Sequence, residues 1–313
     1  MKLEEYDTFD EKKFFFKDGD TKIDFNIDFL FKNIERLQSV GDGFIYRGCG
    51  EAKYKLYNSA QRIYMNQELH KQVPSDQISE HYRHFISNLI SETKKWNNEV
   101  VKKLLISSGI DENNDLAYLS YMQHFGVPTP LLDYTYNPYV ALFFAIDNLN
   151  FYPSNNEIDN YFSLYYTYKQ NTAFHSWQIV FDDNIRKKDI SYETIDLNCM
   201  SIILPEKDLY RIFNSANIIN QEGLFFYNNH PWYPLERTYK EDTDKTRKEL
   251  GKDRFTELMI LDTVSGCFNI HKSLVPAIKR KLNEMGISSN YIYPDMNDFK
   301  KKITNDGILE SLK

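Results

Sequence analysis

The feature that most restricts the fold of this chain is an apolar segment, residues 140–146, that follows a strong helix start. Asn137 is a residue type that caps the first N–H groups of a helix. Pro138 suits the first helical position, because the N–H that it lacks would be unpaired there. Since residues 140–146 are apolar on every face, the helix is predicted to be buried all round. The rest of the chain must therefore fold around it.

The segment ahead of this helix, residues 123–135, is rich in polar groups. It carries the Gln123 amide, the His124 imidazole, the Asp133 carboxylate and the Thr135 hydroxyl. Polar groups that lead directly into a core helix must be paired or be kept for a ligand. One interpretation is a tight turn in which Asp133 and Thr135 accept from nearby backbone donors. The other is a ligand site, where the positive end of the helix favours an anion.

Composition narrows the function classes. The 313 residues carry a net charge of −7, which argues against a general duplex-binding surface but leaves room for local basic patches. Three cysteines, Cys49, Cys199 and Cys267, lie far apart and in no metal-ligand spacing, so we expect a reduced compartment and no metal. The N-terminus lacks an apolar signal core, and no run reaches membrane-spanning length. We therefore expect a soluble, cytoplasmic protein without a membrane partner.

The hydrophobic pattern predicts one large α+β domain with a central mixed or split antiparallel sheet flanked by helices. Residues 1–37 are expected to pack, partly as an amphipathic helix, on a main body formed by residues 38–313. Helical spacing predicts a long helix over 76–105 and a C-terminal helix that begins after Ser273 and ends at Gly286. Strands are predicted at 44–48, 162–166, 178–181, 202–204 and 268–270, with an extended segment at 292–296.

Arg47 stands out within the predicted strand 44–48. Alternation places it on the same face as Ile45, and Gly48 follows it, which allows a backbone or a ligand to approach closely. A guanidinium group is well suited to phosphate. The alternative interpretation is a structural ion pair, for which Asp133 is a candidate partner.

Three motifs resemble the FRG domain, a bacterial family named for a Phe-Arg-Gly tripeptide. Residues 123–135 (QHFGVPTPLLDYT) and 137–145 (NPYVALFFA) resemble its signature, and the naming motif corresponds to Tyr46-Arg47-Gly48, with Tyr in place of Phe. A later family motif is matched by Gln221, Gly223 and Phe225. The resemblance runs from about residue 44 to residue 303, and it would place the chain in phage defence or toxin–antitoxin systems.

The order of these motifs is also similar to that of the ADP-ribosyltransferase superfamily. There, an early strand carries an Arg, a middle strand carries a Ser or Thr ahead of a helix, and a late strand carries a catalytic Glu. Arg47 and Thr135 match the first two elements, whereas the third is ambiguous. Gln221 stands where the Glu is needed and Glu222 is one residue away, which on a strand means the opposite face.

The second resemblance implies an NAD-like cofactor and either ADP-ribosyl transfer or NAD hydrolysis, with a protein or nucleic-acid acceptor left open. A carboxylate would stabilise the positive charge that develops on the ribose. Glu222 supplies it, or Asp133 does, or the site binds a nucleotide without transferring it. The implied catalytic residues are Arg47, Asp133, Gln221 and Glu222. The implied cofactor-binding residues are Tyr46, Gly48, Gln123, His124, Tyr134 and Thr135.

Two other function classes stay open from the residues. An NAD-independent hydrolase or nuclease would use His124 as a base oriented by Asp133. A non-catalytic module would instead sense a nucleotide or a partner protein. No phosphate-binding Gly-Lys-Ser/Thr loop and no nucleophile elbow is present in the sequence.

Overall fold

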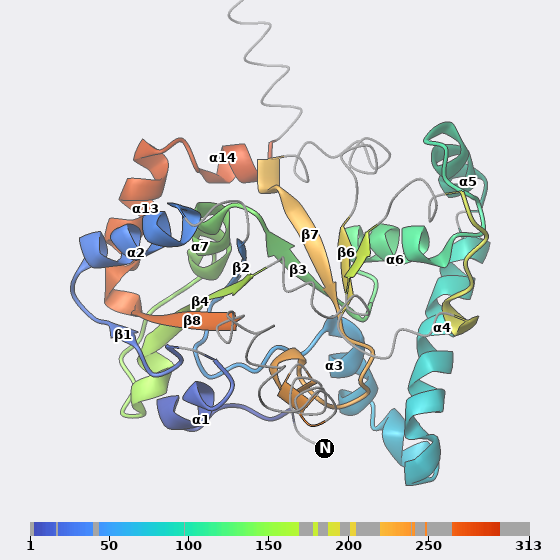
Figure 1. Cartoon of the computed structure of the whole chain (residues 1–313), viewed down its shortest axis with the longest axis horizontal. Coiled ribbons are helices and arrows are strands. Elements are labelled where there is room, and N and C mark those ends of the chain that lie inside the picture. The colour runs from blue at the N-terminus through green and yellow to red at the C-terminus, as the bar shows by residue number, and fades with distance from the viewer. Residues whose placement is uncertain are drawn as a thin grey trace, which may run out of the picture.

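A mixed β-sheet forms the centre of the molecule (Figure 1). The computed structural model describes residues 3–16, 18–39, 44–96, 98–168, 178–180, 187–194, 201–204, 220–238, 240–241, 248 and 265–294. Within them, eight strands are ordered β1-β8-β4-β2-β3-β7-β6-β5. Only the β1–β8 and β5–β6 pairs are parallel. The strands are β1 (Lys22–Ile23), β2 (Phe44–Cys49), β3 (Leu131–Thr135), β4 (Tyr161–Tyr168), β5 (Gln178–Val180), β6 (Ser201–Leu204), β7 (Gly223–Tyr227) and β8 (Ser265–His271).

Helices flank this sheet in separate groups, which confirms the predicted α+β class (Figure 1). The helices α2 (Ile27–Ser39), α7 (Pro138–Ile146), α13 (Val275–Glu284) and α14 (Ser289–Ile292) share one hydrophobic cluster with strands β2, β4 and β8. The helices α3 (Ser59–Asn66), α4 (Ile78–Trp96), α5 (Asn98–Ser107) and α6 (Asp115–His124) form a second cluster with β3 and β7. Short helices complete the described part: α1 (Phe9–Lys13) and the 3₁₀ turns at Leu69–Gln72, Ser75–Gln77, Glu157–Asn160, Tyr192–Thr194 and Lys272–Leu274.

Helix α7 begins as its sequence predicts. Asn137 Oδ1 accepts hydrogen bonds from the backbone N–H groups of Tyr139 and Val140, at 3.0 and 3.4 Å, and Pro138 occupies the first turn. The helix is buried except at Tyr139, which is partly exposed, and at Phe144, whose side chain is 38% exposed. A Cβ added to Gly48 would lie 1.9 Å from the carbonyl oxygen of Ala141. Gly48 therefore allows the backbone of α7 to lie directly against β2.

The predicted alternation along β2 is confirmed by the clusters to which its residues belong. Tyr46 packs with α7 in the first cluster, whereas Ile45 packs on the opposite face in a third cluster with residues of β3, β4 and β7. The helical segment expected over 76–105 is observed as α4 and α5, which follow a 3₁₀ turn at Ser75–Gln77, and residue 97 between them lies outside the described residues. Ile292 ends helix α14 and does not begin an extended segment, because Ser288 caps a short helix there. Residue 181 of a predicted strand and residues 295–296 of the predicted extended segment lie outside the described residues.

The N-terminal segment contributes to the core of the molecule. Strand β1 pairs with β8, and Leu30, Phe31 and Ile34 of α2 are buried in the first cluster. Among the described helices, none combines the length and the apolar character needed to cross a bilayer.

Candidate functional site

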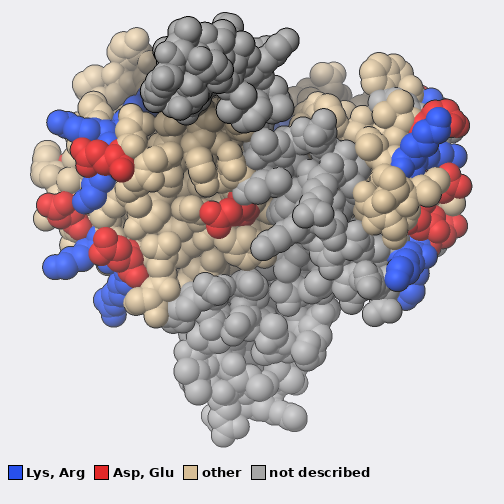
Figure 2. All heavy atoms as spheres, turned by 90° about the horizontal axis from the view of Figure 1, so that it is seen from above, with Lys and Arg blue, Asp and Glu red and all other residues tan. Residues whose placement is uncertain are grey.

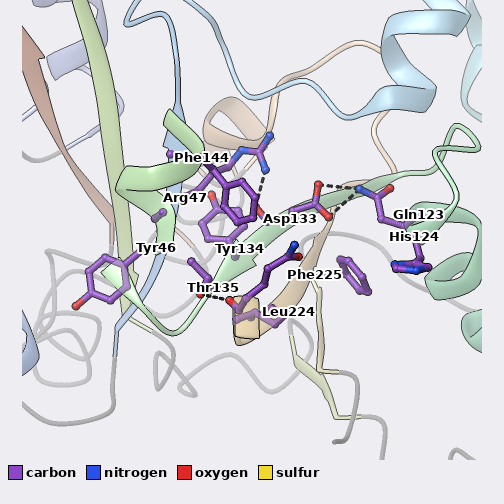
Figure 3. A pocket seen from close by; sticks show the side chains of 14 residues that line it. Tyr46, Arg47, Gln123, His124, Asp133, Tyr134, Thr135, Phe144, Leu224 and Phe225 are labelled. Carbon is purple, nitrogen blue, oxygen red and sulfur yellow. Dashed lines mark hydrogen bonds between the residues drawn. The ribbon is translucent and has the colours of Figure 1, made fainter. Parts of the chain in front are cut away.

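A cavity of about 360 Å³ lies between helices α6 and α7 and strands β2, β3 and β7 (Figure 3). It collects residues from segments far apart in the sequence. Its lining is formed by Tyr46, Arg47, Gly48, Gln123, His124, Asp133, Tyr134, Thr135, Ala141, Phe144, Gln221, Gly223, Leu224 and Phe225. The structure thus brings together nine of the ten residues that the sequence nominated, and Glu222 is the one that it leaves out.

Arg47 lies where strands β2 and β3 separate. The ladder between the two strands contains a single residue pair, Tyr46 with Thr135. Beyond that pair, Arg47 Nη1 donates to the backbone carbonyl of Asp133 at 2.5 Å. The Arg47 Nε is buried and has no hydrogen-bond partner within the described residues. The proposed ion pair with the Asp133 carboxylate is therefore not formed, and the guanidinium group keeps donor capacity beside the cavity.

The Asp133 carboxylate points away from Arg47 and toward Gln123 (Figure 3). Gln123 Nε2 donates to both carboxylate oxygens, at 3.0 and 2.9 Å. The other end of the same amide is also fixed, because Gln123 Oε1 accepts from the Thr129 hydroxyl. Thr129 is fully buried, and its Oγ1 accepts in turn from the Leu131 N–H at 3.2 Å. A continuous chain of hydrogen bonds therefore orients Asp133 from the protein interior.

His124 occupies the end of α6, beside this chain. Burial lowers the pKa of its imidazole below the ordinary value, which keeps the ring neutral at neutral pH. Its ring meets the Phe125 ring edge-on, with centroids 5.0 Å apart. Both Asp133 carboxylate oxygens accept hydrogen bonds from Gln123, so Gln123 orients this carboxylate. The hydrolase hypothesis instead expected Asp133 to orient the His124 ring.

Thr135 connects β3 to the segment ahead of β7. Its hydroxyl donates to the Gln221 carbonyl at 2.6 Å and accepts from the Asn137 N–H at 3.0 Å. Both of its hydrogen-bonding roles are therefore used within the protein. Gln221 lines the cavity, and its Nε2 donates to the Ile292 carbonyl at 3.4 Å.

Glu222 lies outside the cavity lining, and the strand expected at 221–223 begins only at Gly223. Glu222 has a φ of +46°, a left-handed conformation that interrupts a strand, so the alternation argument does not apply to it. Its exposed carboxylate accepts from Asn137 Nδ2 at 3.1 Å. Glu222 thus contacts the residue that caps α7, and Asp133 is the carboxylate that lines the cavity.

Two aromatic residues nominated from the sequence are mainly packed. Tyr46 is buried against α7, and Tyr134 lies on the opposite sheet face, with its ring centroid 4.8 Å from that of Phe226. Burial raises the pKa of both hydroxyls, so both stay protonated. The Tyr134 ring centroid lies 6.0 Å from the Arg47 guanidinium carbon. The Tyr134 ring therefore lies beside Arg47, and both tyrosines form part of the cavity wall.

Sequence reasoning gave no ligand role to Phe144, Phe225 or Thr129. Phe144 was predicted to be buried with the rest of its helix. In the structure its side chain is 38% exposed and lines the cavity. Phe225 was identified only as part of a motif. Thr129 stands between two prolines, which is the one sequence sign that its backbone is held rigidly.

On the face shown in Figure 2, the charged side chains visible in the described part gather mainly at the two flanks and include both signs. The described residues on that face therefore form no continuous basic surface of the kind that duplex nucleic acid requires. Among the described residues, no group of three or more His, Cys, Asp or Glu side chains is placed to hold a metal ion.

Comparisons with curated proteins and with solved structures gave no match to this chain. A family model does match, over residues 42–152, which is about one third of the chain. The matched range contains β2, α6, β3 and α7, and therefore Arg47, Gln123 and Asp133, whereas β7 and the remaining expected resemblance up to residue 303 lie beyond it. The family is described as the FRG domain, and residues 42–152 are the part of the chain that is similar to it.

Proposed function

We propose that the cavity binds a nucleotide, and that an NAD-like dinucleotide is the ligand class to which it is best suited. The observation that carries the proposal is the state of Arg47. Its guanidinium group lines the cavity, makes no ion pair within the described residues, and has a buried Nε without a partner. A buried N–H donor without an acceptor is costly unless a ligand completes its contacts.

The polar groups divide the cavity into two parts. Arg47 offers donors for phosphate oxygens. Asp133 offers an acceptor, held in one orientation by Gln123, for ribose hydroxyls or for a positive charge. Phe144 and Phe225 supply apolar walls for a planar ring. The first N–H groups of α7 are already capped by Asn137, so Arg47 and not the helix end is the phosphate contact.

A second candidate function is cleavage of the nicotinamide–ribose bond. Asp133 is favoured as the carboxylate for this step because it lines the cavity and is exposed, whereas Glu222 is outside it. In hydrolysis, the glycosidic C–N bond breaks with its electron pair leaving on nicotinamide. Water then attacks the ribose carbon and loses a proton, giving ADP-ribose. Asp133 would stabilise the positive charge that develops on the ribose.

Calorimetric titration of the full chain with NAD⁺, ADP-ribose and ATP tests the binding proposal. We expect binding of at least one phosphate-bearing ligand, and a loss of at least tenfold in affinity in Arg47→Gln, since a charge-assisted contact contributes about 1.5–3 kcal/mol. Arg36→Gln, on the exposed side of α2, is the matched control and should bind like the original protein. Equal affinities in Arg47→Gln and in the original protein would overturn the proposal.

The catalytic candidate requires a separate assay of nicotinamide release. If Asp133 acts, Asp133→Asn should abolish release while ADP-ribose still binds, because the isosteric amide carries no charge. Glu222→Gln should keep the original rate. Turnover of a substrate other than NAD that is lost in His124→Ala would favour the hydrolase hypothesis instead, and binding without any turnover would favour a sensor.

A further inference from the structure

We propose that Asp133, Phe225 and Gln123 form a cation corner, through which the cavity selects a planar cationic ring over its neutral counterpart. For a nicotinamide dinucleotide, this means that the oxidised form is preferred to the reduced form. The inference rests on the proposed function and deepens it, by naming the residues that set specificity within the same cavity.

The sheet register places the two main members side by side. Asp133 of β3 is paired directly with Phe225 of β7, in an antiparallel ladder. Directly opposite residues project from the same sheet face, with Cβ atoms about 4.5–5.5 Å apart. Both residues line the cavity. A ring stacked on Phe225 would therefore lie within reach of the Asp133 carboxylate, and an aromatic face itself attracts a cation.

The partner that orients Asp133 leaves its negative charge in place. Gln123 is neutral, so it does not cancel the charge of the carboxylate. A 180° rotation of its side-chain amide would turn Oε1, which accepts from Thr129, toward the carboxylate oxygens. Among the described residues, Asp133 takes part in no ion pair. The carboxylate thus presents an uncompensated charge at a fixed position in the cavity.

The neighbouring groups preserve this charge. Arg47 contacts the backbone carbonyl of Asp133 and not its carboxylate (Figure 3). His124, the other titratable group that lines the cavity here, is neutral at neutral pH because burial lowers the pKa of its imidazole. A positive pole at Arg47 and a negative pole at Asp133 therefore lie in one cavity, and they match a ligand with phosphates at one end and a cationic ring at the other.

The oxidised and reduced dinucleotides provide a matched pair of probes. They share the phosphates, the riboses and the adenine, and they differ in the charge of the nicotinamide ring. Cation–π attraction and a partly exposed carboxylate together predict about a tenfold preference for NAD⁺ over NADH. Asp133→Asn should bring the ratio of the two dissociation constants close to one, mainly by weakening NAD⁺ binding.

The experiment is calorimetric titration of the full chain with NAD⁺ and with NADH, at the same ionic strength. Asp10→Asn, an exposed residue of α1, changes the net charge equally and should leave the ratio unchanged. Phe225→Leu is a second variant, which should lower the ratio without altering charge. Equal affinity for the two forms, or an unchanged ratio in both cavity variants, would overturn the inference while the nucleotide proposal stands. If neither dinucleotide binds, the proposed function fails, and the inference fails with it.

Discussion

The surroundings of two basic residues, Lys12 and Arg47, differ in how fully their polar groups are paired. Lys12 of α1 is 0% exposed, and its Nζ donates to the Ala52 carbonyl, to Ser163 Oγ and to Asn269 Oδ1 at 2.6–3.0 Å. Ser163 and Asn269 are also bonded to each other at 3.0 Å. Arg47 has one backbone acceptor and an unpaired Nε beside a cavity.

This difference separates a structural role from a binding role. An ammonium group has three donor hydrogens, and Lys12 has an acceptor for each of them. Such a site stabilises the fold by joining α1 to strands β4 and β8, and it has no capacity for a ligand. The Arg47 site contributes less to the fold and keeps capacity for another molecule. Substitution of Lys12 should therefore change the free energy of unfolding, and substitution of Arg47 should change the affinity for a ligand.

The largest expected effect is on Lys12. Lys12→Met should lower the free energy of unfolding by about 4 kcal/mol, because it leaves buried acceptors without a donor. Urea denaturation followed by fluorescence measures this change. Lys13→Met is the matched control, since Lys13 is exposed and its ion pair with Asp20 is screened by solvent. Similar losses in both variants would show that the buried contacts of Lys12 have no special weight.

The next largest effect concerns the contact between β2 and α7. Gly48→Ala places a methyl group 1.9 Å from the Ala141 carbonyl oxygen and 2.8 Å from the Ala145 nitrogen, both in the helix backbone. We expect a loss of about 3 kcal/mol, because backbone atoms of a core helix cannot move aside cheaply. Gly50→Ala meets its nearest atom only at 3.4 Å and should be nearly neutral. A Gly48→Ala variant as stable as Gly50→Ala would contradict the close approach of α7.

A smaller effect is expected from His230, whose Nδ1 accepts from the backbone N–H groups of Trp232 and Tyr233 at 3.3 and 2.8 Å. Burial, followed by the nearby Arg237 charge, lowers the pKa of His230 to about 4. Because the folded-state pKa lies below the unfolded value, this contribution to stability is complete above about pH 6.5 and is lost as the pH falls toward about 4. We expect it to amount to about 2 kcal/mol after allowance for solvent screening.

Stability measured between pH 7 and pH 4 tests this expectation. His230→Asn should flatten the decline over this range, since the variant has no imidazole to protonate. Parallel profiles in the variant and in the original protein would assign the decline to other groups.

The smallest effect on stability should come from Arg47. Arg47→Gln is expected to change the free energy of unfolding by less than about 1 kcal/mol, because it removes one partly exposed contact and also an incompletely paired charge. The comparison is sharpened if this variant loses ligand affinity yet unfolds at nearly the same urea concentration. A loss as large as that of Lys12→Met would make Arg47 a structural residue.

Local features of the fold could be predicted from the sequence, whereas contacts between distant segments could not. The Asn137-Pro138 start of α7 and the alternation along β2 follow from residue types at neighbouring positions. The left-handed conformation of Glu222 could not be predicted from the sequence, because Gln-Glu-Gly is equally compatible with a strand or a turn.

The same distinction applies to the candidate site. Arg47 and Asp133 were nominated because their residue types and motifs pointed to a ligand. Their actual partners depend on tertiary structure. Gln123 reaches Asp133 only because the end of α6 lies beside β3, and Arg47 reaches a backbone carbonyl only because β2 and β3 separate there. Spacing in the sequence carries no information on either approach.

The most direct test of the central claim, that the cavity beside Arg47 is a nucleotide site, is a crystal structure of the chain grown with NAD⁺. The account predicts a phosphate within hydrogen-bond distance of the Arg47 guanidinium group and the nicotinamide ring against Phe225, beside Asp133. Nucleotide bound elsewhere, or a cavity that stays empty at saturating NAD⁺, would contradict it.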